Sequence, residues 1–355
     1  MTKTFKLGAI FLITVISLQV VRMIFMFINL PDNIVSWLFS GVFQGLFLGL
    51  FPYLLYKAWI SRDKGAYALD FRLKTKIHPA SYPIAIGIGF LTFFINLGVA
   101  VVWYMILTST GYSFPGGVGT IYSSPEVLIF ELIATAVLPA IFEELINRGL
   151  LLSALDRQKN DKRTILIIGI FFGFLHQNAA QLGPTVFGGL VMAYLAVKCN
   201  NIVPGMIVHF LNNALAVLSS YGQQKGNAIG AFYNLFLSYV SQNFIVMLLC
   251  WAGAGVLLWA LLKQFEKLNR KYREASDPDP LPVIVQAVPP VRRLDADYFA
   301  QIYGMPSREQ APQIELVQEP EQARKTKWWE YGLLACAFLA TFLATTVTYI
   351  VGRIW

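Results

Sequence analysis

The sequence predicts an all-α fold, a polytopic bundle of transmembrane helices with eight or nine spans. Of the 355 residues, 56% are hydrophobic and only 14% are charged, whereas soluble chains carry roughly 25% charged residues. Apolar runs of about 20 residues, the length that crosses a bilayer as a helix, recur along most of the chain. We therefore expect an integral, multi-pass membrane protein, and we assign it to the plasma membrane.

Nine apolar segments are candidate spans. The first follows Lys3 and Lys6 as a signal peptide would, but it is too long and lacks a cleavage site, so we expect a retained helix. The fifth and sixth are short, and they either cross with little tilt or form a re-entrant pair. The segments are 7–29, 34–56, 82–107, 127–154, 164–179, 183–198, 202–220, 236–262 and 329–351.

The basic residues of the loops predict an orientation. Loop 57–76 carries six Lys or Arg residues, 108–125 carries none, 156–163 carries four and 263–273 carries five. Because cytoplasmic loops hold the Lys/Arg excess, this alternation puts the N-terminus in the cytoplasm. The net charge of +8 has the same origin, so we expect basic segments on anionic lipid and no nucleic-acid partner.

Three charged residues interrupt an apolar run in "AIFEELINRG", residues 140–149. Each costs about 2.5–3.5 kcal/mol at the centre of a membrane helix. Glu144 and Arg148 are four residues apart, so they share a helix face and can form an ion pair. Glu143 is rotated by about 100° from Glu144 and points elsewhere. Within its own helix, only Asn147 is placed to be its partner.

Two histidines lie in apolar runs on other predicted helices. His176 lies about 18 Å along its helix from the cytoplasmic end, as Glu143 does, and His209 with Asn213 lies about 10–17 Å in. Three helices thus deliver polar groups to a similar depth, which is typical of a buried site. Hydrogen bonding between helices is the alternative reading of each histidine alone.

Such a set of side chains is suited to hydrolysis. A carboxylate and a neutral imidazole can hold and deprotonate a water molecule. A second histidine and an asparagine can donate hydrogen bonds to a developing oxyanion. We find no nucleophile-elbow motif around a serine or cysteine, so attack by an activated water is better supported than an acyl-enzyme route.

Three short motifs resemble those of a known family. "EELINR" (143–148), "FGFLH" (172–176) and "HFLNN" (209–213) match EExxxR, FxxxH and HxxxN. In this order they resemble the CAAX-protease and bacteriocin-processing (CPBP, or Abi) family of intramembrane endopeptidases, which includes the CAAX prenyl protease. The resemblance covers about 125–220.

The resemblance implies a role for each matching residue. Glu143 would be the general base, and His176 would help to hold the water. His209 and Asn213 would form the oxyanion hole. The remaining pair, Glu144 and Arg148, would be structural.

The residues leave metal dependence open. Members of the family have been called metalloproteases, and a metal-free glutamate mechanism is the other view. If a divalent metal such as zinc binds, its ligands would be Glu143, His176 and His209. A catalytic zinc also needs a separate base, so we favour a mechanism without a cofactor.

The sequence therefore predicts an intramembrane endopeptidase that acts on a membrane-embedded or lipid-anchored protein or peptide. A non-enzymatic scaffold or immunity protein that keeps the motifs is one alternative. A transporter or proton relay is another, although we find no inverted repeat.

Five regions follow from this reading. Residues 264–327 are rich in proline, which predicts an extended and partly disordered cytoplasmic linker. The alternative is a docking or regulatory segment, in which residues 294–305 form a short amphipathic helix. The regions are 1–125 (N-terminal transmembrane helices), 126–220 (catalytic core), 221–263 (transmembrane helix), 264–327 (linker) and 328–355 (C-terminal transmembrane helix).

Overall fold

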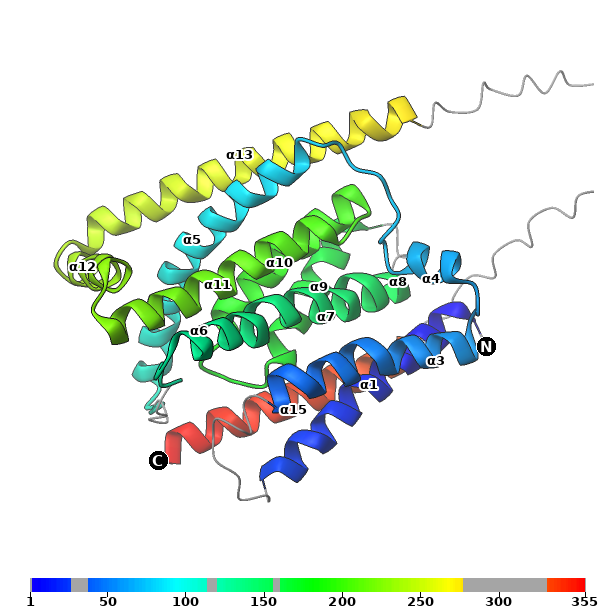
Figure 1. Ribbon diagram of the computed structural model, residues 1–355, viewed down its shortest axis with the longest axis horizontal. Helices are drawn as coiled ribbons and strands as arrows, with labels where there is room; N and C mark the ends of the chain where they lie inside the picture. Colours follow the sequence, from blue (N-terminus) through cyan, green and yellow to red (C-terminus); the bar gives the residue numbers. More distant parts are fainter. Residues whose placement is uncertain (1, 27–37, 114–119, 156–159, 277–330, 355) are drawn as a thin grey trace, which may run out of the picture. The chain divides into compact units, whose positions relative to one another are not determined.

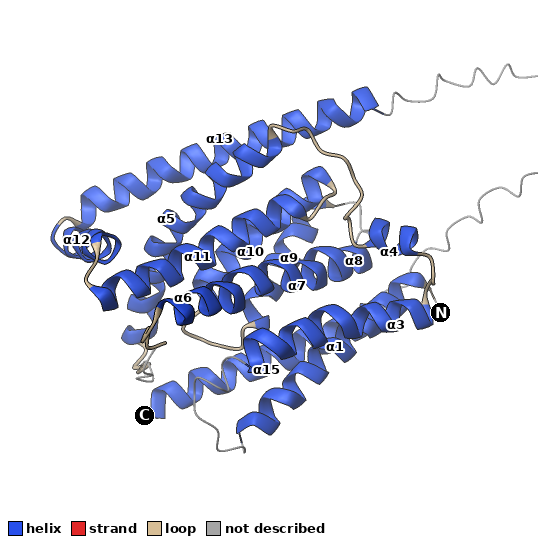
Figure 2. Ribbon diagram, viewed as in Figure 1, coloured by secondary structure: helices blue, strands red, loops and turns tan. Residues whose placement is uncertain are grey.

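A computed structural model describes residues 2–26, 38–113, 120–155, 160–276 and 331–354. Every regular element in these ranges is a helix, which confirms the all-α prediction (Figure 2). The chain divides into one unit of Met1–Tyr272 with Thr326–Trp355 and a second of Arg273–Lys325. The predicted helix at 294–305 lies outside the described residues.

Figure 1 shows the helices in the order of the chain. A continuous helical stretch at 38–59 ends in α3, and another at 125–155 contains α6, α7 and α8. The elements are α1 (Lys3–Met26), α3 (Phe51–Trp59), α4 (Lys64–Asp70), α5 (Ser81–Ser109), α6 (Pro125–Glu131), α7 (Leu138–Glu144), α8 (Leu152–Leu155), α9 (Asp161–Leu175), α10 (Leu182–Cys199), α11 (Val203–Lys225), α12 (Ala228–Gln242), α13 (Phe244–Ser276) and α15 (Gly332–Ile354).

Seven helices in the described ranges are long and apolar enough to cross a membrane, close to the eight or nine expected. Two predicted spans account for the difference. The fifth, 164–179, corresponds to α9, which has only 15 residues and ends at Leu175. The second, 34–56, lies partly outside the described residues.

The helix at 125–155 is the central element of the site. Pro125 occupies its first turn, where a missing N–H leaves no hydrogen bond unmade. Wider π-type turns at Leu132–Val137 and Leu145–Leu151 flank α7, and Pro139 lies between them. Proline cannot donate to the helical ladder, and π-type turns are frequent at functional sites. The irregular backbone thus coincides with the charged motif.

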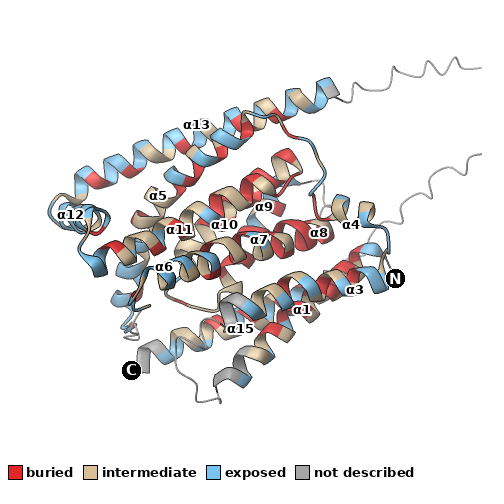
Figure 3. Ribbon diagram, in the orientation of Figure 1, coloured by how far each residue is buried: buried red, intermediate tan, exposed pale blue. Residues whose placement is uncertain are grey.

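The site helices are surrounded on both sides. In Figure 1, α10 and α11 run above α7, whereas α1 and α3 run below it. One buried apolar cluster joins α1, α9 and the 125–155 helix, and a second joins α5, α10 and α11. Buried residues accordingly concentrate in the middle helices, whereas α12 and α13 are largely exposed (Figure 3). In a membrane, that exposed apolar surface would face lipid.

Two predicted boundaries at the end of this region were wrong. Residues 221–235 were expected to form a loop, but α11 continues to Lys225 and α12 begins at Ala228. Gly226 ends α11 with a φ of +63°, and the Asn227 side chain caps α12. The span expected at 236–262 begins at Phe244, and its helix continues through the basic stretch to Ser276.

Ion pairs bring segments that were predicted to be cytoplasmic close together. The Nζ atom of Lys3 lies 2.6 Å from a carboxylate oxygen of Asp70. The Nζ atom of Lys198 lies 2.9 Å from Asp161 and 2.8 Å from Glu266. These contacts agree with a position of the connected segments on the same side of the membrane. Which side that is stays a prediction.

The close packing of α9 on α10 gives a test of the fold. A Cβ atom on Gly169 would lie 2.9 Å from the backbone nitrogen of Leu190. Because backbone cannot yield as a side chain can, Gly169→Ala should destabilise the protein by about 1–3 kcal/mol.

Thermal unfolding in detergent measures this effect. Gly253→Ala in α13 is the matched control, because nothing lies within 4 Å of its added Cβ atom. Equal melting temperatures for the two variants would contradict the close approach of α9 and α10.

Candidate active site

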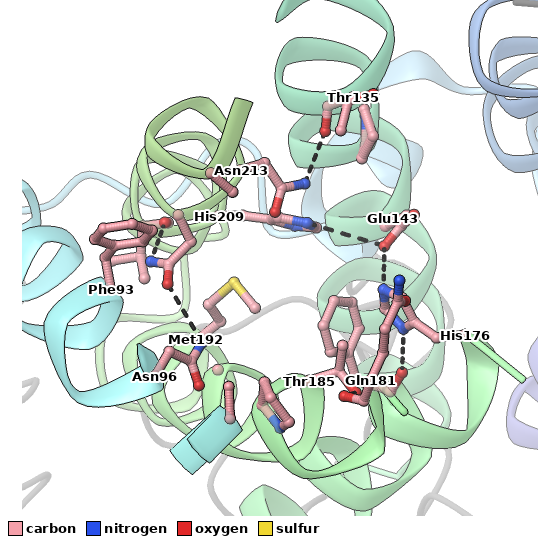
Figure 4. A pocket seen from close by; sticks show the side chains of 18 of the residues that line it. Phe93, Asn96, Thr135, Glu143, His176, Gln181, Thr185, Met192, His209 and Asn213 are labelled. Carbon is pink, nitrogen blue, oxygen red and sulfur yellow. Dashed lines mark hydrogen bonds and ion pairs between the residues drawn. The ribbon is translucent and has the colours of Figure 1, made fainter. Parts of the chain in front are cut away.

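A cavity of about 540 Å³ lies between α5, the 125–155 helix, α10 and α11. Its volume falls in the range of ligand-binding pockets. Phe93, Leu97 and Met192 give it apolar walls, and polar side chains converge on it (Figure 4). The polar lining comprises Gln44, Asn96, Thr135, Glu143, His176, Gln181, Thr185, His209, Asn212 and Asn213.

Glu143 lies between the two histidines. Its Oε2 atom is 4.0 Å from Nε2 of His176 and 4.0 Å from Nε2 of His209. Figure 4 shows both imidazoles directed towards this carboxylate. The distances are too long for direct hydrogen bonds, and a polar contact of this length accommodates a bridging water. The structure therefore brings together three predicted residues from three separate segments of the chain.

Local structure explains why His176 reaches this point. His176 was expected to lie within a helix, but α9 ends at Leu175 and His176 is the residue that follows it. Gln177 follows with a φ of +51°, in the left-handed region that stops a helix. The chain then turns towards α10, and His176 remains at the edge of the cavity.

The second nitrogen of each imidazole is held by an acceptor. Nδ1 of His176 lies 2.9 Å from the carbonyl oxygen of Phe172. Nδ1 of His209 lies 3.1 Å from Oε1 of Glu144. A carbonyl and an ionised carboxylate only accept hydrogen bonds, so both Nδ1 atoms carry the proton. In its neutral form each histidine therefore presents the lone pair of Nε2 to the space beside Glu143.

Glu144 and Arg148 form a fully buried ion pair behind the cavity. Nη1 of Arg148 lies 2.6 Å from Oε1 of Glu144, and both side chains are 0% exposed. Nη2 of Arg148 also donates to the carbonyl of Gly189 at 2.9 Å. A buried charge is tolerated when it is paired and hydrogen-bonded. The pair has these contacts, but Oε2 of Glu144 and Nε of Arg148 are buried without a hydrogen-bond partner among the described residues.

Residues 125–215 match a family model described as "Type II CAAX prenyl endopeptidase Rce1-like". This region is similar to the CAAX protease family. The match supports an intramembrane endopeptidase of the CAAX type, and it covers all three motifs. No curated protein and no solved structure matches the chain.

The sequence reading gave no role to Phe172, which lies in the CAAX-protease region. The Arg148 guanidinium lies 4.4 Å from the centre of its ring. The same ring meets His176 edge-on at 4.9 Å and His209 at 5.5 Å between centroids. Phe172 thus separates the ion pair from the cavity while fixing both imidazoles. Its place four residues before His176 was the available signal.

Asn213 and Asn147 make contacts that the sequence did not predict. Nδ2 of Asn213 donates to the carbonyl of Thr135 at 2.8 Å. A carboxamide has two N–H donors, so one remains for another acceptor. Asn147 was expected to be the partner of Glu143 within its own helix. Its Nδ2 donates to the backbone carbonyl of Glu143, at 2.8 Å.

A helix outside the CAAX-protease region supports the segment after His176. The amide N–H of Ala179 donates to Oγ1 of Thr348 in α15 at 3.1 Å. Nε1 of Trp103 in α5 donates to the carbonyl of Ala179 at 2.8 Å. The segment that carries His176 is therefore fixed from two sides.

The three candidate metal ligands do not fit a tetrahedral zinc site as they are placed. Ligand distances of about 2.0–2.1 Å put tetrahedral ligand atoms about 3.3 Å apart, whereas Oε2 of Glu143 lies 4.0 Å from each Nε2. Within the described ranges, no group of three or more His, Cys, Asp or Glu residues has a geometry that could hold a metal ion. We therefore derive no reaction step through a metal.

The buried pair makes a prediction about stability. Arg148→Met leaves the Glu144 carboxylate buried without its cation, which should destabilise the protein by about 3–5 kcal/mol. Adding Glu144→Gln removes the uncompensated charge and should recover most of that loss.

The unfolding midpoint in detergent is measured for the wild type, for Arg148→Met and for the double variant. If the single and double variants are equally unstable, the ion pair is not what holds this region together. The double variant should still lack activity, because Glu144 also binds His209.

Proposed function

We propose that this protein is an intramembrane endopeptidase in which Glu143 activates a water molecule to hydrolyse a peptide bond. The observation that carries the proposal is the position of the Glu143 carboxylate, 4.0 Å from both Nε2 atoms at the edge of a large cavity. A water between these groups has a base on one side and an imidazole on another. The region's family supports the same reaction class.

The proposed first step is attack of this water on the scissile carbonyl carbon. The water donates one hydrogen to Glu143 and the other to Nε2 of His176, whose Nδ1 is engaged with Phe172. As the new C–O bond forms, Glu143 takes a proton and the carbonyl oxygen becomes an oxyanion. Glu143 then gives that proton to the leaving nitrogen, the C–N bond breaks, and the carboxylate is regenerated.

His209 and Asn213 are the proposed donors to the oxyanion. His209 can donate from Nε2 only as the imidazolium, because its Nδ1 proton is bound to Glu144. The ionised Glu144 carboxylate stabilises that cation in a buried setting, since the His209 side chain is only 5% exposed. Asn213 has a second amide N–H beside the one that it gives to Thr135. Donors fixed in advance lower the barrier most in such dry surroundings.

We propose a membrane-embedded or lipid-anchored protein or peptide as the substrate. The cavity combines apolar walls from Phe93 and Leu97 with amides such as Asn96 and Asn212, which suits an apolar segment with peptide groups to bind. A plasma-membrane location, a cytoplasmic N-terminus and contact of the basic segments with anionic lipid belong to the same proposal. We propose that no metal takes part.

The decisive variant is Glu143→Gln. The amide keeps the size of the side chain but cannot take a proton from water, so cleavage should fall by about 10²–10⁴-fold. Glu126→Gln is the matched control, because Glu126 is an exposed residue in the first turn of the same helix. Membrane peptides are compared by mass spectrometry between cells that make each variant at equal protein levels.

Three results would contradict parts of this proposal. Unchanged cleavage by Glu143→Gln would remove Glu143 as the base, and rescue of a deletion phenotype by an inactive Glu143→Gln protein would favour a scaffold. Loss of wild-type cleavage in a chelator, with recovery on adding zinc, would show that a metal is required.

A further inference from the structure

A second, smaller cavity lies on the other side of Glu143. It has a volume of about 50 Å³ and is lined by α1, the 38–59 helix, the 125–155 helix and α9. Gln44, Glu143 and His176 are the residues that also line the large cavity. These three side chains therefore form the wall between the two spaces. We call the smaller space the rear chamber.

The rear chamber contains buried polar atoms without protein partners. Oδ1 of Asn147 and Oε1 of Gln44 are buried and have no hydrogen-bond partner among the described residues. Asn147 is only 1% exposed, and its Nδ2 is fixed on the carbonyl of Glu143. Asn147 and Gln19 both line the rear chamber. Buried amide oxygens of this kind are normally satisfied by a donor such as water.

The chamber is suitable for water. A single buried water needs about 10–15 Å³ of such volume and two to four polar partners. The rear chamber has about 50 Å³ and offers the amides of Gln19, Gln44 and Asn147. Val15, Leu18 and Leu48 close it on the apolar side, which separates its contents from lipid.

We propose that the rear chamber is a water-binding site that supplies the hydrolytic water to Glu143 from the side opposite the substrate. The proposal rests on the function proposed above. Each peptide bond that is hydrolysed consumes one water, whose oxygen joins the new carboxyl group and whose proton passes through Glu143 to the leaving amine. A substrate in the large cavity covers Glu143 from the front, so replacement water has to come from behind.

Gln44 and Asn147 are then water-binding residues of the reaction. Gln44 belongs to the wall between the spaces, so its amide can hand a water from one to the other. Asn147 holds water one helical turn from Glu143, because the two residues are four apart on the 125–155 helix.

Two variants test the supply of water without altering Glu143 or the histidines. Gln44→Met keeps the length of the side chain but removes the amide, and Val15→Leu fills part of the chamber with a methylene group. Both should lower kcat by at least about tenfold because the water is displaced. Val15→Leu should also leave KM unchanged, since Val15 lines the rear chamber and is not among the residues that line the large cavity. Val20→Leu is the matched control, because Val20 is exposed on the same helix, and it should retain the wild-type kcat.

Thermal unfolding in detergent identifies any variant that fails to fold. If either Gln44→Met or Val15→Leu does not fold, the other still tests the water supply. Wild-type kcat in a folded Gln44→Met protein, alongside an inactive Glu143→Gln protein, would overturn the water supply while leaving Glu143 as the base. Cleavage by Glu143→Gln would instead overturn the proposed function.

A high-resolution structure gives a readout that does not depend on activity. Ordered water density is expected within hydrogen-bonding distance of Oε1 of Gln44 and Oδ1 of Asn147 in the Glu143→Gln protein. It should be reduced or displaced in Val15→Leu. A dry chamber in the Glu143→Gln protein would overturn the proposal.

Discussion

The buried ion pair of Glu144 and Arg148 is the interaction on which the candidate site depends. Two charges without water would be strongly unfavourable in an apolar helix bundle unless each is paired and hydrogen-bonded. Besides their ion pair, Arg148 contacts Gly189 of α10 and the ring of Phe172 in α9, and Glu144 contacts His209 of α11. One ion pair therefore connects four helices and fixes an imidazole at the same time.

The two adjacent glutamates have opposite environments because a helix rotates by about 100° per residue. Glu144 is turned into the bundle, where a cation and an imidazole neutralise it. Glu143 is turned to the wall between the large cavity and the rear chamber, with both histidines 4.0 Å away. The same pair of residues thus supplies a structural carboxylate and a carboxylate open to water, which is the arrangement that a water-activating site needs.

Much of the fold could be predicted because apolar length and periodicity are local properties. The errors came where local signals overlap. Hydropathy merges α12 with α13, which only Asn243 separates. It also does not show that α11 ends at Gly226 and that α12 is capped by Asn227. Similarly, the apolar run around His176 hides the end of α9, which a left-handed Gln177 sets. Boundaries of this kind depend on single backbone angles, which an averaged window does not record.

The sequence by itself determined the helical membrane class, the three motifs and the spacing that lets Glu144 face Arg148. Only the tertiary structure decided that Glu144 binds His209, that Phe172 packs against both imidazoles, and that Thr348 holds the segment after His176. It also decided the presence of the rear chamber. The physical reason is that periodicity fixes which residues share a face of one helix, whereas contacts between residues 65 positions apart depend on how helix faces pack.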